Sequence, residues 1–346
     1  MKRARWTNSM KATTVSRQYM SSRNLLPSAA IIFFLIFTGT VSASYSGDEP
    51  LSPVFYDELN GGYVFSTGDS IYSGQMNPGN YYNASFDIAI PSDAEPVFSR
   101  LYVYWAWSNL EKAAIYPSIS ISATPAGTHE FTLAERYVDS KGFVSSYDFF
   151  SGTDSYEVTG IGAGENSFSV TAGNSAADNS TFVIEGMGLL VVYESPSSPL
   201  VQIWADEGCD MLYSDYGITP EMATATAVFN GTVDTGSVKS ARIELVAPSG
   251  GYTRSDIPEK NVVLFNRDTD GSLPGFLESL ISAIFPGYNG KEWIDCFDSD
   301  ELRQVGIESR DVGPYLKGSN NIVRVRDRGD YMLFTNAILS IEKEEK

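Results

Sequence analysis

Three carboxylates lie close to a tryptophan in the middle of the chain, and this combination could do chemistry. Asp206, Glu207 and Asp210 follow Trp204 in one short segment. Glycoside hydrolases use two carboxylates held about 5–10 Å apart across the sugar, one as an acid and one as a nucleophile or base. Sequence does not show whether these groups face each other, and acids are abundant in this chain. We therefore assign no catalytic residue and treat Trp204, Asp206 and Glu207 as a candidate ligand patch.

A second segment could bind a metal ion. Asn266, Asp268 and Asp270 alternate and are followed by Gly271, which matches the first half of an EF-hand calcium loop. The bidentate glutamate that ends such a loop would fall at position 277, which is Leu277. A calcium site at Asn266, Asp268 and Asp270 remains a candidate, and the alternative is an ordinary turn rich in Asn, Asp and Gly.

The other reactive residue types are scarce. His129 is the only histidine, so a Ser-His-Asp triad or a zinc site with several histidines is hard to build. Cys209 and Cys296 are the only cysteines, and they form either a disulfide or two buried thiols. The formal net charge is −19, which excludes nucleic acid as a natural partner because phosphate binding requires basic side chains.

Aromatic residues concentrate in one predicted strand. The segment 101–107 reads Leu-Tyr-Val-Tyr-Trp-Ala-Trp. Alternation in a strand predicts Tyr102 and Tyr104 on one face and Val103, Trp105 and Trp107 on the other. One face must belong to the core, and the other could bind a sugar or a protein, since exposed aromatic groups mark binding surfaces.

The N-terminal segment predicts export. Residues 1–43 contain six basic residues and no acid, and they end in a short apolar run followed by Val41, Ser42 and Ala43. This order is typical of a secretory signal peptide, and the apolar run is too short for a transmembrane helix, which needs about 20 residues. We expect cleavage after Ala43, no stable membrane span afterwards, and an extracellular or cell-surface location. The Asn-x-Ser/Thr sequences at Asn83, Asn179 and Asn230 are then candidate glycosylation sites.

The remaining residues predict an all-β fold. Runs rich in β-branched and aromatic residues alternate with clusters of Asn, Gly, Asp, Ser and Pro. The chain also repeats weakly: residues 99–103 match 241–245, 157–158 match 311–312, and 164–170 match 318–325. We therefore predict two tandem jelly-roll-like antiparallel β-sandwiches, with domains at 44–195 and 199–343 joined by a proline-containing linker. Apolar residues at helical spacing predict one short helix at 275–285 in the second sandwich.

Several motifs together resemble an uncharacterised family of exported archaeal proteins, known mainly from methanogens as domain of unknown function 3344. They are Arg100–Val103 followed by Trp105 and Trp107, Trp204–Gly208, Phe229–Thr232, and Gly329–Tyr331 with Asn336–Leu339. The resemblance covers Pro53 to Ile341 and implies an extracellular or surface location in an archaeon. It implies no activity and no catalytic residues. Family members often have Asn-Glu-Gly where this chain has Asp206-Glu207-Gly208.

Three functions are compatible with these observations. The first is a non-enzymatic structural or adhesive protein of the cell surface, whose partners would be other surface proteins or glycans. The second is a carbohydrate-binding module, assisted by calcium if the Asn266 segment binds that ion. The third is a secreted hydrolase, which would require two of the carboxylates near Trp204 to face each other in a cleft. Nothing in the sequence requires the protein to be an enzyme.

Overall fold

The computed structural model describes residues 45–142, 146–252, 259–267 and 289–344. In this part of the chain almost all regular structure is β, and the helical elements are two short 3-10 turns, η1 (Thr235–Ser237) and η2 (Gly313–Tyr315). The all-β prediction is therefore confirmed. The helix predicted at 275–285 lies outside the described residues, as do residues 1–44 with the predicted signal peptide.

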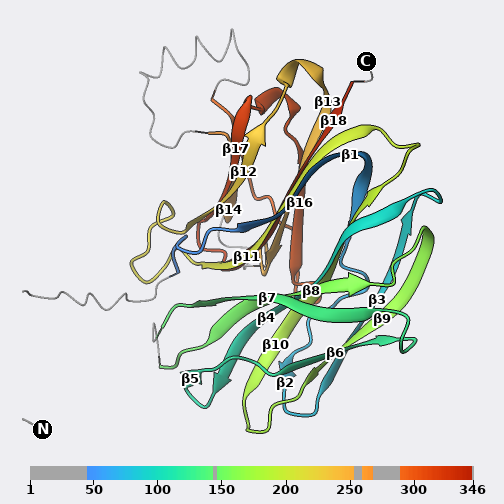
Figure 1. The fold of residues 1–346 in the computed structure, drawn as a ribbon. Helices are drawn as coiled ribbons and strands as arrows, with labels where there is room; N and C mark the ends of the chain where they lie inside the picture. The colour runs from blue at the N-terminus through green and yellow to red at the C-terminus, as the bar shows by residue number, and fades with distance from the viewer. Residues whose placement is uncertain (1–44, 143–145, 253–258, 268–288, 345–346) are drawn as a thin grey trace, which may run out of the picture. The chain divides into compact units, whose positions relative to one another are not determined.

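The strands form two successive sets (Figure 1). The first set is β1 (Ser52–Ser66), β2 (Gln75–Met76), β3 (Tyr81–Ile90), β4 (Glu95–Leu110), β5 (Ala113–Ala114), β6 (Ile119–Thr124), β7 (Glu130–Ser140), β8 (Phe150–Thr159), β9 (Gly164–Asn174) and β10 (Thr181–Glu194). The second set is β11 (Leu200–Leu212), β12 (Thr224–Thr232), β13 (Val238–Pro248), β14 (Asn261–Phe265), β15 (Lys291–Ile294), β16 (Val305–Asp311), β17 (Ser319–Asp327) and β18 (Met332–Lys343).

Each set builds one antiparallel sandwich, and the two sandwiches share a topology. In the second sandwich, one sheet has the order β11-β18-β13-β16 and the other β12-β17-β14-β15. In the first sandwich, the corresponding orders are β1-β10-β4-β8, extended by β7, and β3-β9-β6. Without the short β2 and β5, each copy has eight strands, which can be numbered 1 to 8 along the chain. In both copies the first sheet then has the order 1-8-3-6, and the second sheet begins with 2-7-4. This is the double-sheet arrangement of a jelly roll.

The sequence repeat coincides with this structural repeat. Residues 99–103 lie on β4 and their counterparts 241–245 on β13, which are the third strands of the two copies. Arg100 is the cross-strand partner of Glu157 on β8, and Arg242 occupies the same relation to Asp311 on β16. Opposite charges directly across an antiparallel pair stabilise the pairing. The weak sequence similarity therefore marks equivalent strands of a duplicated sandwich.

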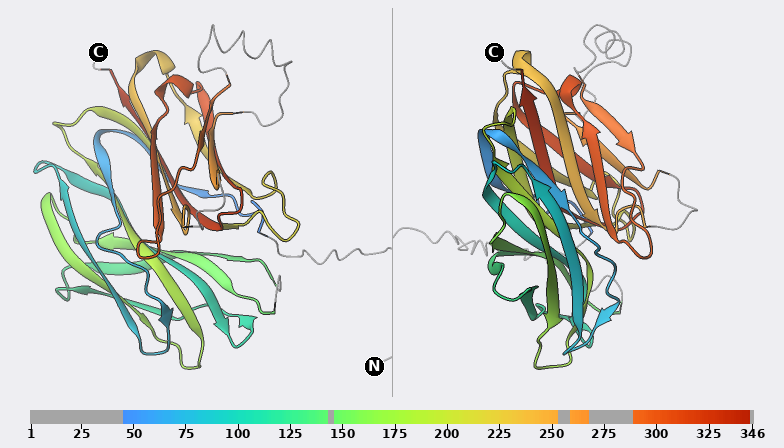
Figure 2. Two further views of the ribbon diagram at one scale, coloured as in Figure 1. Left: turned by 180° about the vertical axis from the view of Figure 1, so that it is seen from behind. Right: turned by 90° about the vertical axis from the view of Figure 1, so that its right-hand side faces the viewer.

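The first strand joins the two sandwiches. Residues 52–60 of β1 pair with β11, whereas residues 61–66 pair with β10. The change occurs where the carbonyl of Asn60 accepts from the amide of Ser195 and the amide of Gly61 donates to the carbonyl of Pro199. The predicted linker at 195–199 is thus a short, hydrogen-bonded connection across β1, and residues 42–346 form one compact unit. Figure 2 shows the blue β1 between the green and the yellow-to-red strands.

Three of the four apolar clusters fill the two sandwiches and the layer between them. One core fills the first sandwich, around Phe86, Val103 and Trp105, and another fills the second, around Phe265, Phe334 and Leu339. A third core lies between the two large sheets and joins residues of both copies: Tyr102, Tyr104, Leu190, Val192, Ile203, Val246 and Ile338. We call this third core the sandwich interface. Burying each large apolar side chain stabilises the fold by about 1.5–3 kcal/mol, so the two copies are expected to unfold together.

The cysteine and glycosylation predictions have different outcomes. Cys209 and Cys296 are both free and buried, in separate apolar clusters, so of the two alternatives the structure has two buried thiols and no disulfide between them. Asn83, Asn179 and Asn230 are all exposed. Glycosylation at these three sites stays a prediction that their exposure permits.

Candidate functional site

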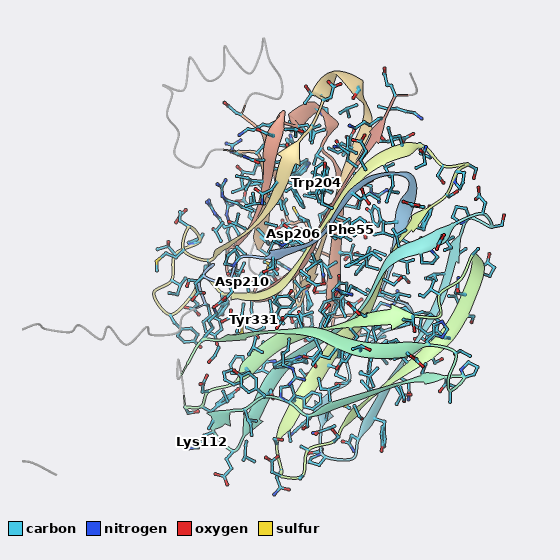
Figure 3. All side chains as sticks on the ribbon, in the orientation of Figure 1. Phe55, Lys112, Trp204, Asp206, Asp210 and Tyr331 are labelled. Carbon is cyan, nitrogen blue, oxygen red and sulfur yellow. The ribbon has the colours of Figure 1, made fainter. Side chains whose placement is uncertain are left out.

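The predicted ligand patch is buried. Trp204 is 2% exposed, its indole N–H donates to the carbonyl of Asn230 at 2.7 Å, and its ring packs on Tyr56. Asp206 and Glu207 are each 1% exposed, and as neighbours on β11 they point to opposite faces of the sheet. Figure 3 shows Trp204, Asp206 and Asp210 at successive points along this strand. The three predicted patch residues therefore do not form a surface that a ligand could reach.

Each of the two carboxylates has its own buried surroundings. Glu207 faces the first sandwich, where Tyr137 donates to it at 3.2 Å and Arg100 lies 3.9 Å away. Burial raises the pKa of Glu207, and its partners Tyr102 and Arg100 oppose that rise. Asp206 faces the core of the second sandwich beside Val228, and burial raises its pKa to about 7. This separation removes the pair on which hydrolysis by Asp206 and Glu207 depended.

Asn266, the described member of the predicted calcium site, has a structural role. Its side-chain oxygen accepts from the amide of Ile322 at 2.8 Å, and its side-chain nitrogen donates to Asn321 and to the carbonyl of Tyr315. These bonds fix the end of β14 against β17. Asp268 and Asp270 lie outside the described residues. The side chain of Asn266 is engaged in hydrogen bonds within the fold, and calcium binding by this segment stays a prediction.

His129 has a local role. Its ring stacks on Phe168 with the ring centroids 3.9 Å apart, and Nδ1 is 2.9 Å from the hydroxyl of Thr128. Burial lowers its pKa. These contacts anchor the loop before β7 to the sandwich.

A pocket of about 530 Å³ opens where β4 ends, next to β10 and the segment before β2. Its lining combines four aromatic side chains with four polar ones: Tyr72, Trp107, Tyr147 and Phe182 with Gln75, Asn109, Glu111 and Thr181. We call it the Trp107 pocket. A few polar groups among aromatic walls are the usual composition of a small-molecule site, because the walls supply contact area and the polar groups fix orientation.

A β-bulge places Trp107 in this pocket. The pairing of β4 with β8 shifts between Trp105 and Ser108, and Trp107 has a φ of 56°, which is an unusual conformation for a bulky residue. The expected alternation holds for Tyr102 and Tyr104 at the sandwich interface and for Trp105 in the first core. The prediction that Trp107 lies on the same face as Trp105 was wrong, because the bulge turns the Trp107 side chain away from the core of the first sandwich. Such backbone strain is concentrated at functional sites.

Aromatic neighbours hold Trp107 in place. Its ring centroid lies 4.2 Å from that of Phe149 and 5.7 Å from that of Tyr331. The side-chain amide of Asn109 donates to the carbonyl of Trp107 at 2.9 Å, which fixes the bulge. The ring is therefore held rigidly at the pocket wall, and a bound ligand would not have to order it.

A second constellation was missed by sequence reasoning. Asp48, Asp139 and Asp210 each offer a carboxylate oxygen within 4.8 Å of the other two, and the ammonium of Lys141 lies beside them. The residues come from three distant segments of the chain, so spacing could not reveal them. The closely spaced Asp139 and Lys141 on a strand end were the only local signal.

The fold defines a tandem jelly-roll protein with a strained, aromatic-walled pocket. The chain belongs to the family described as protein of unknown function (DUF3344), whose model matches residues 44–342. A comparison with curated proteins finds no significant match. Among solved structures, a chain of the Sputnik virophage structure, determined by cryo-EM at 3.5 Å resolution, is 9% identical with a TM-score of 0.18, covering 84% of this chain and 87% of that one. So low a TM-score does not establish a shared fold. The described residues include no helix that is both long and apolar enough to cross a bilayer.

Proposed function

We propose that this chain is an exported, non-enzymatic adhesion protein of an archaeal cell surface, which binds saccharides in the Trp107 pocket. The export and surface location rest on the N-terminal sequence and are compatible with three exposed Asn-x-Ser/Thr sequences. The saccharide ligand rests on the pocket, in which an aromatic ring is held by its backbone in an unfavourable conformation beside amide and carboxylate groups.

The composition of the Trp107 pocket suits a sugar. The apolar C–H face of a pyranose packs on an aromatic ring, and its hydroxyls need donors and acceptors around the rim. Trp107, Tyr72 and Tyr147 supply the rings, and Gln75, Asn109 and Glu111 supply amide and carboxylate groups. The volume of about 530 Å³ lies within the range of small-ligand sites, which is about 300–1,000 Å³.

Adhesion is favoured over hydrolysis by the position of the acids. The candidate acids Asp206 and Glu207 are buried on opposite faces of β11, whereas glycoside hydrolysis needs two carboxylates that face a common cleft. Glu111 is the acidic side chain that lines the Trp107 pocket. A single carboxylate can orient a sugar through its hydroxyls.

A glycan array followed by calorimetry tests the proposal. The chain from residue 44 should bind a subset of glycans, and W107A should weaken the affinity by at least tenfold. Tyr116→Ala is the matched control, because Tyr116 is 60% exposed, stacks on Phe150 and does not line the pocket. Arrays with no binding, or equal loss in both variants, would contradict the saccharide proposal and leave the structural role.

The location has its own test. Mass spectrometry of the protein recovered from the outer surface of its native cells should find a mature N-terminus at Ser44. Recovery of the intact chain from the cytosol would contradict export.

A further inference from the structure

An acidic centre lies where the N-terminal segment meets β7 and β11. It contains Asp48, Asp139, Asp210 and Lys141, and we keep this name for these four residues. The amide of Met211 donates to Asp139 at 2.7 Å, so the centre joins the end of β7 in the first sandwich to β11 in the second. Figure 3 shows Asp210 on β11 near this junction.

Lys141 satisfies only part of the negative charge. Its ammonium is 2.6 Å from Asp139, 2.9 Å from Asp48 and 3.4 Å from the carbonyl of Ser46, so its donors are directed to these three groups. Lys141 is 1% exposed and Asp139 is 5% exposed. Three ionised carboxylates against one ammonium would leave an excess of two negative charges, and burial raises the pKa of both Asp139 and Asp210.

Asp210 provides an independent observation. It is 0% exposed, and neither of its carboxylate oxygens has a hydrogen-bond partner. The amide of Glu49 favours the charged form of this carboxyl but does not complete a hydrogen bond to it. A buried carboxylate without a partner is strongly destabilising, and proteins normally neutralise one by pairing or by binding a metal ion.

We propose that the acidic centre binds a divalent cation of the calcium type, with Asp48, Asp139 and Asp210 as its ligands. Oxygens that bind one calcium ion at 2.3–2.6 Å can be at most about 5 Å apart, and these three lie within 4.8 Å of one another. The carbonyl of Ser46, which faces the ammonium of Lys141, is a further oxygen beside the acidic centre. The side chain of Asp48 is 46% exposed and provides access from solvent.

The proposed cation and Lys141 together neutralise the three carboxylates. Lys141 holds Asp48 and Asp139 in place, and the cation satisfies the oxygens of Asp210 that Lys141 does not reach. The competing explanation is that Asp210 is protonated and shares its proton with a neighbouring carboxylate. Only the cation explanation predicts a dependence of stability on divalent metal at constant pH.

Thermal unfolding and calorimetry of the EDTA-treated chain from residue 44 test the proposal. Calcium chloride should raise the unfolding temperature beyond the effect of potassium chloride at equal ionic strength, and titration should give saturable heat with one site per chain. Magnesium chloride should act more weakly, because its smaller ion requires closer octahedral ligands. D57N, which removes an exposed carboxylate on β1, is the control and should respond as the wild type does.

Three variants locate the site. D210N should abolish the calcium-dependent rise, and D48N, at a partly exposed position, should weaken calcium binding by about tenfold because one ligand charge is lost. Lys141→Met should make folding more dependent on calcium, since the cation is then the remaining neutralising group. A wild type that shows neither heat nor a shift with calcium overturns the proposal, as does full calcium binding by both D210N and D48N. Because glycan binding is not measured, these outcomes are independent of the proposed adhesion function.

Discussion

The hydroxyl of Tyr104 on β4 donates a 2.7 Å hydrogen bond to the side-chain oxygen of Asn336 on β18, and both residues are buried at the sandwich interface. The bond connects equivalent large sheets of the two copies. Around it, the tyrosine rings of Tyr102 and Tyr104 stack with their centroids 6.1 Å apart. The copies are therefore joined by a specific polar contact within an apolar layer.

This contact predicts a cost for removing the hydroxyl. Tyr104→Phe should lower the free energy of unfolding by about 1–3 kcal/mol, because the buried oxygen of Asn336 loses its donor. Replacing both residues, as Y104F with N336L, should cost less than the sum of the single changes. Urea unfolding measures all three variants. Additive losses would show that the two groups do not interact.

Removal of the Asp154 carboxylate should lower the free energy of unfolding by more than removal of the Tyr104 hydroxyl does. It is fully buried and accepts from Nε and Nη2 of Arg136 at 2.7 and 2.6 Å and from the indole of Trp105 at 2.9 Å. Asp154→Ala should cost about 3–5 kcal/mol, because it leaves a partly buried guanidinium and an indole N–H without their acceptor. Glu157→Ala is the comparison: Glu157 is 61% exposed and pairs with Arg100 at 3.5 Å, so its loss should cost less than about 1 kcal/mol. Similar losses in the two variants would be inconsistent with this interpretation.

The raised pKa of the buried Glu185 leads us to expect that the free energy of unfolding falls as pH rises. It is buried on β10 with a hydrogen bond of 3.0 Å from Ser249, and burial raises its pKa from 4.5 to about 8. Between these values the folded protein holds a proton that the unfolded chain has lost, so the free energy of unfolding decreases as pH rises, by about 1.4 kcal/mol per pH unit at most. Above about pH 8 this contribution is fully lost.

Urea unfolding from pH 5 to pH 9 measures this dependence. The difference in stability between E185Q and the wild type should move in favour of E185Q as pH rises, because glutamine has no charge to bury. Glu130→Gln, which removes an exposed carboxylate instead of a buried one, is the comparison variant. A constant difference for E185Q would exclude Glu185 as the titrating group.

The positive φ of Trp107 leads us to expect that glycine is more stable than alanine at this position. In a strand, glycine is ordinarily less stable than alanine. At the φ of 56° found here, alanine meets the steric cost of the left-handed region and glycine does not. W107G should therefore be more stable than W107A by about 1 kcal/mol, although both lose the contact with Phe149. Denaturant unfolding compares them, and the opposite order would show that the bulge relaxes once the ring is removed.

Sequence alone determined the all-β class and the duplication. Residues 100 and 242 lie on equivalent strands because strand signals are local: β-branched and aromatic runs favour extended backbone wherever the turns allow it. The same locality explains why Tyr102, Tyr104 and Trp105 fell on the faces that alternation predicts.

Tertiary structure decided where chemistry can occur. Trp204 and Asp206 resembled a surface site, but β11 lies inside the unit between β1 and β18, so both are buried. Trp107 left its predicted face because one bulge changed the register, and the aspartates at 48, 139 and 210 meet only when β7 packs on β11. Periodicity describes the neighbours of a residue along its own strand. Which strands become neighbours depends on contacts between distant parts of the chain, and these carry no local pattern.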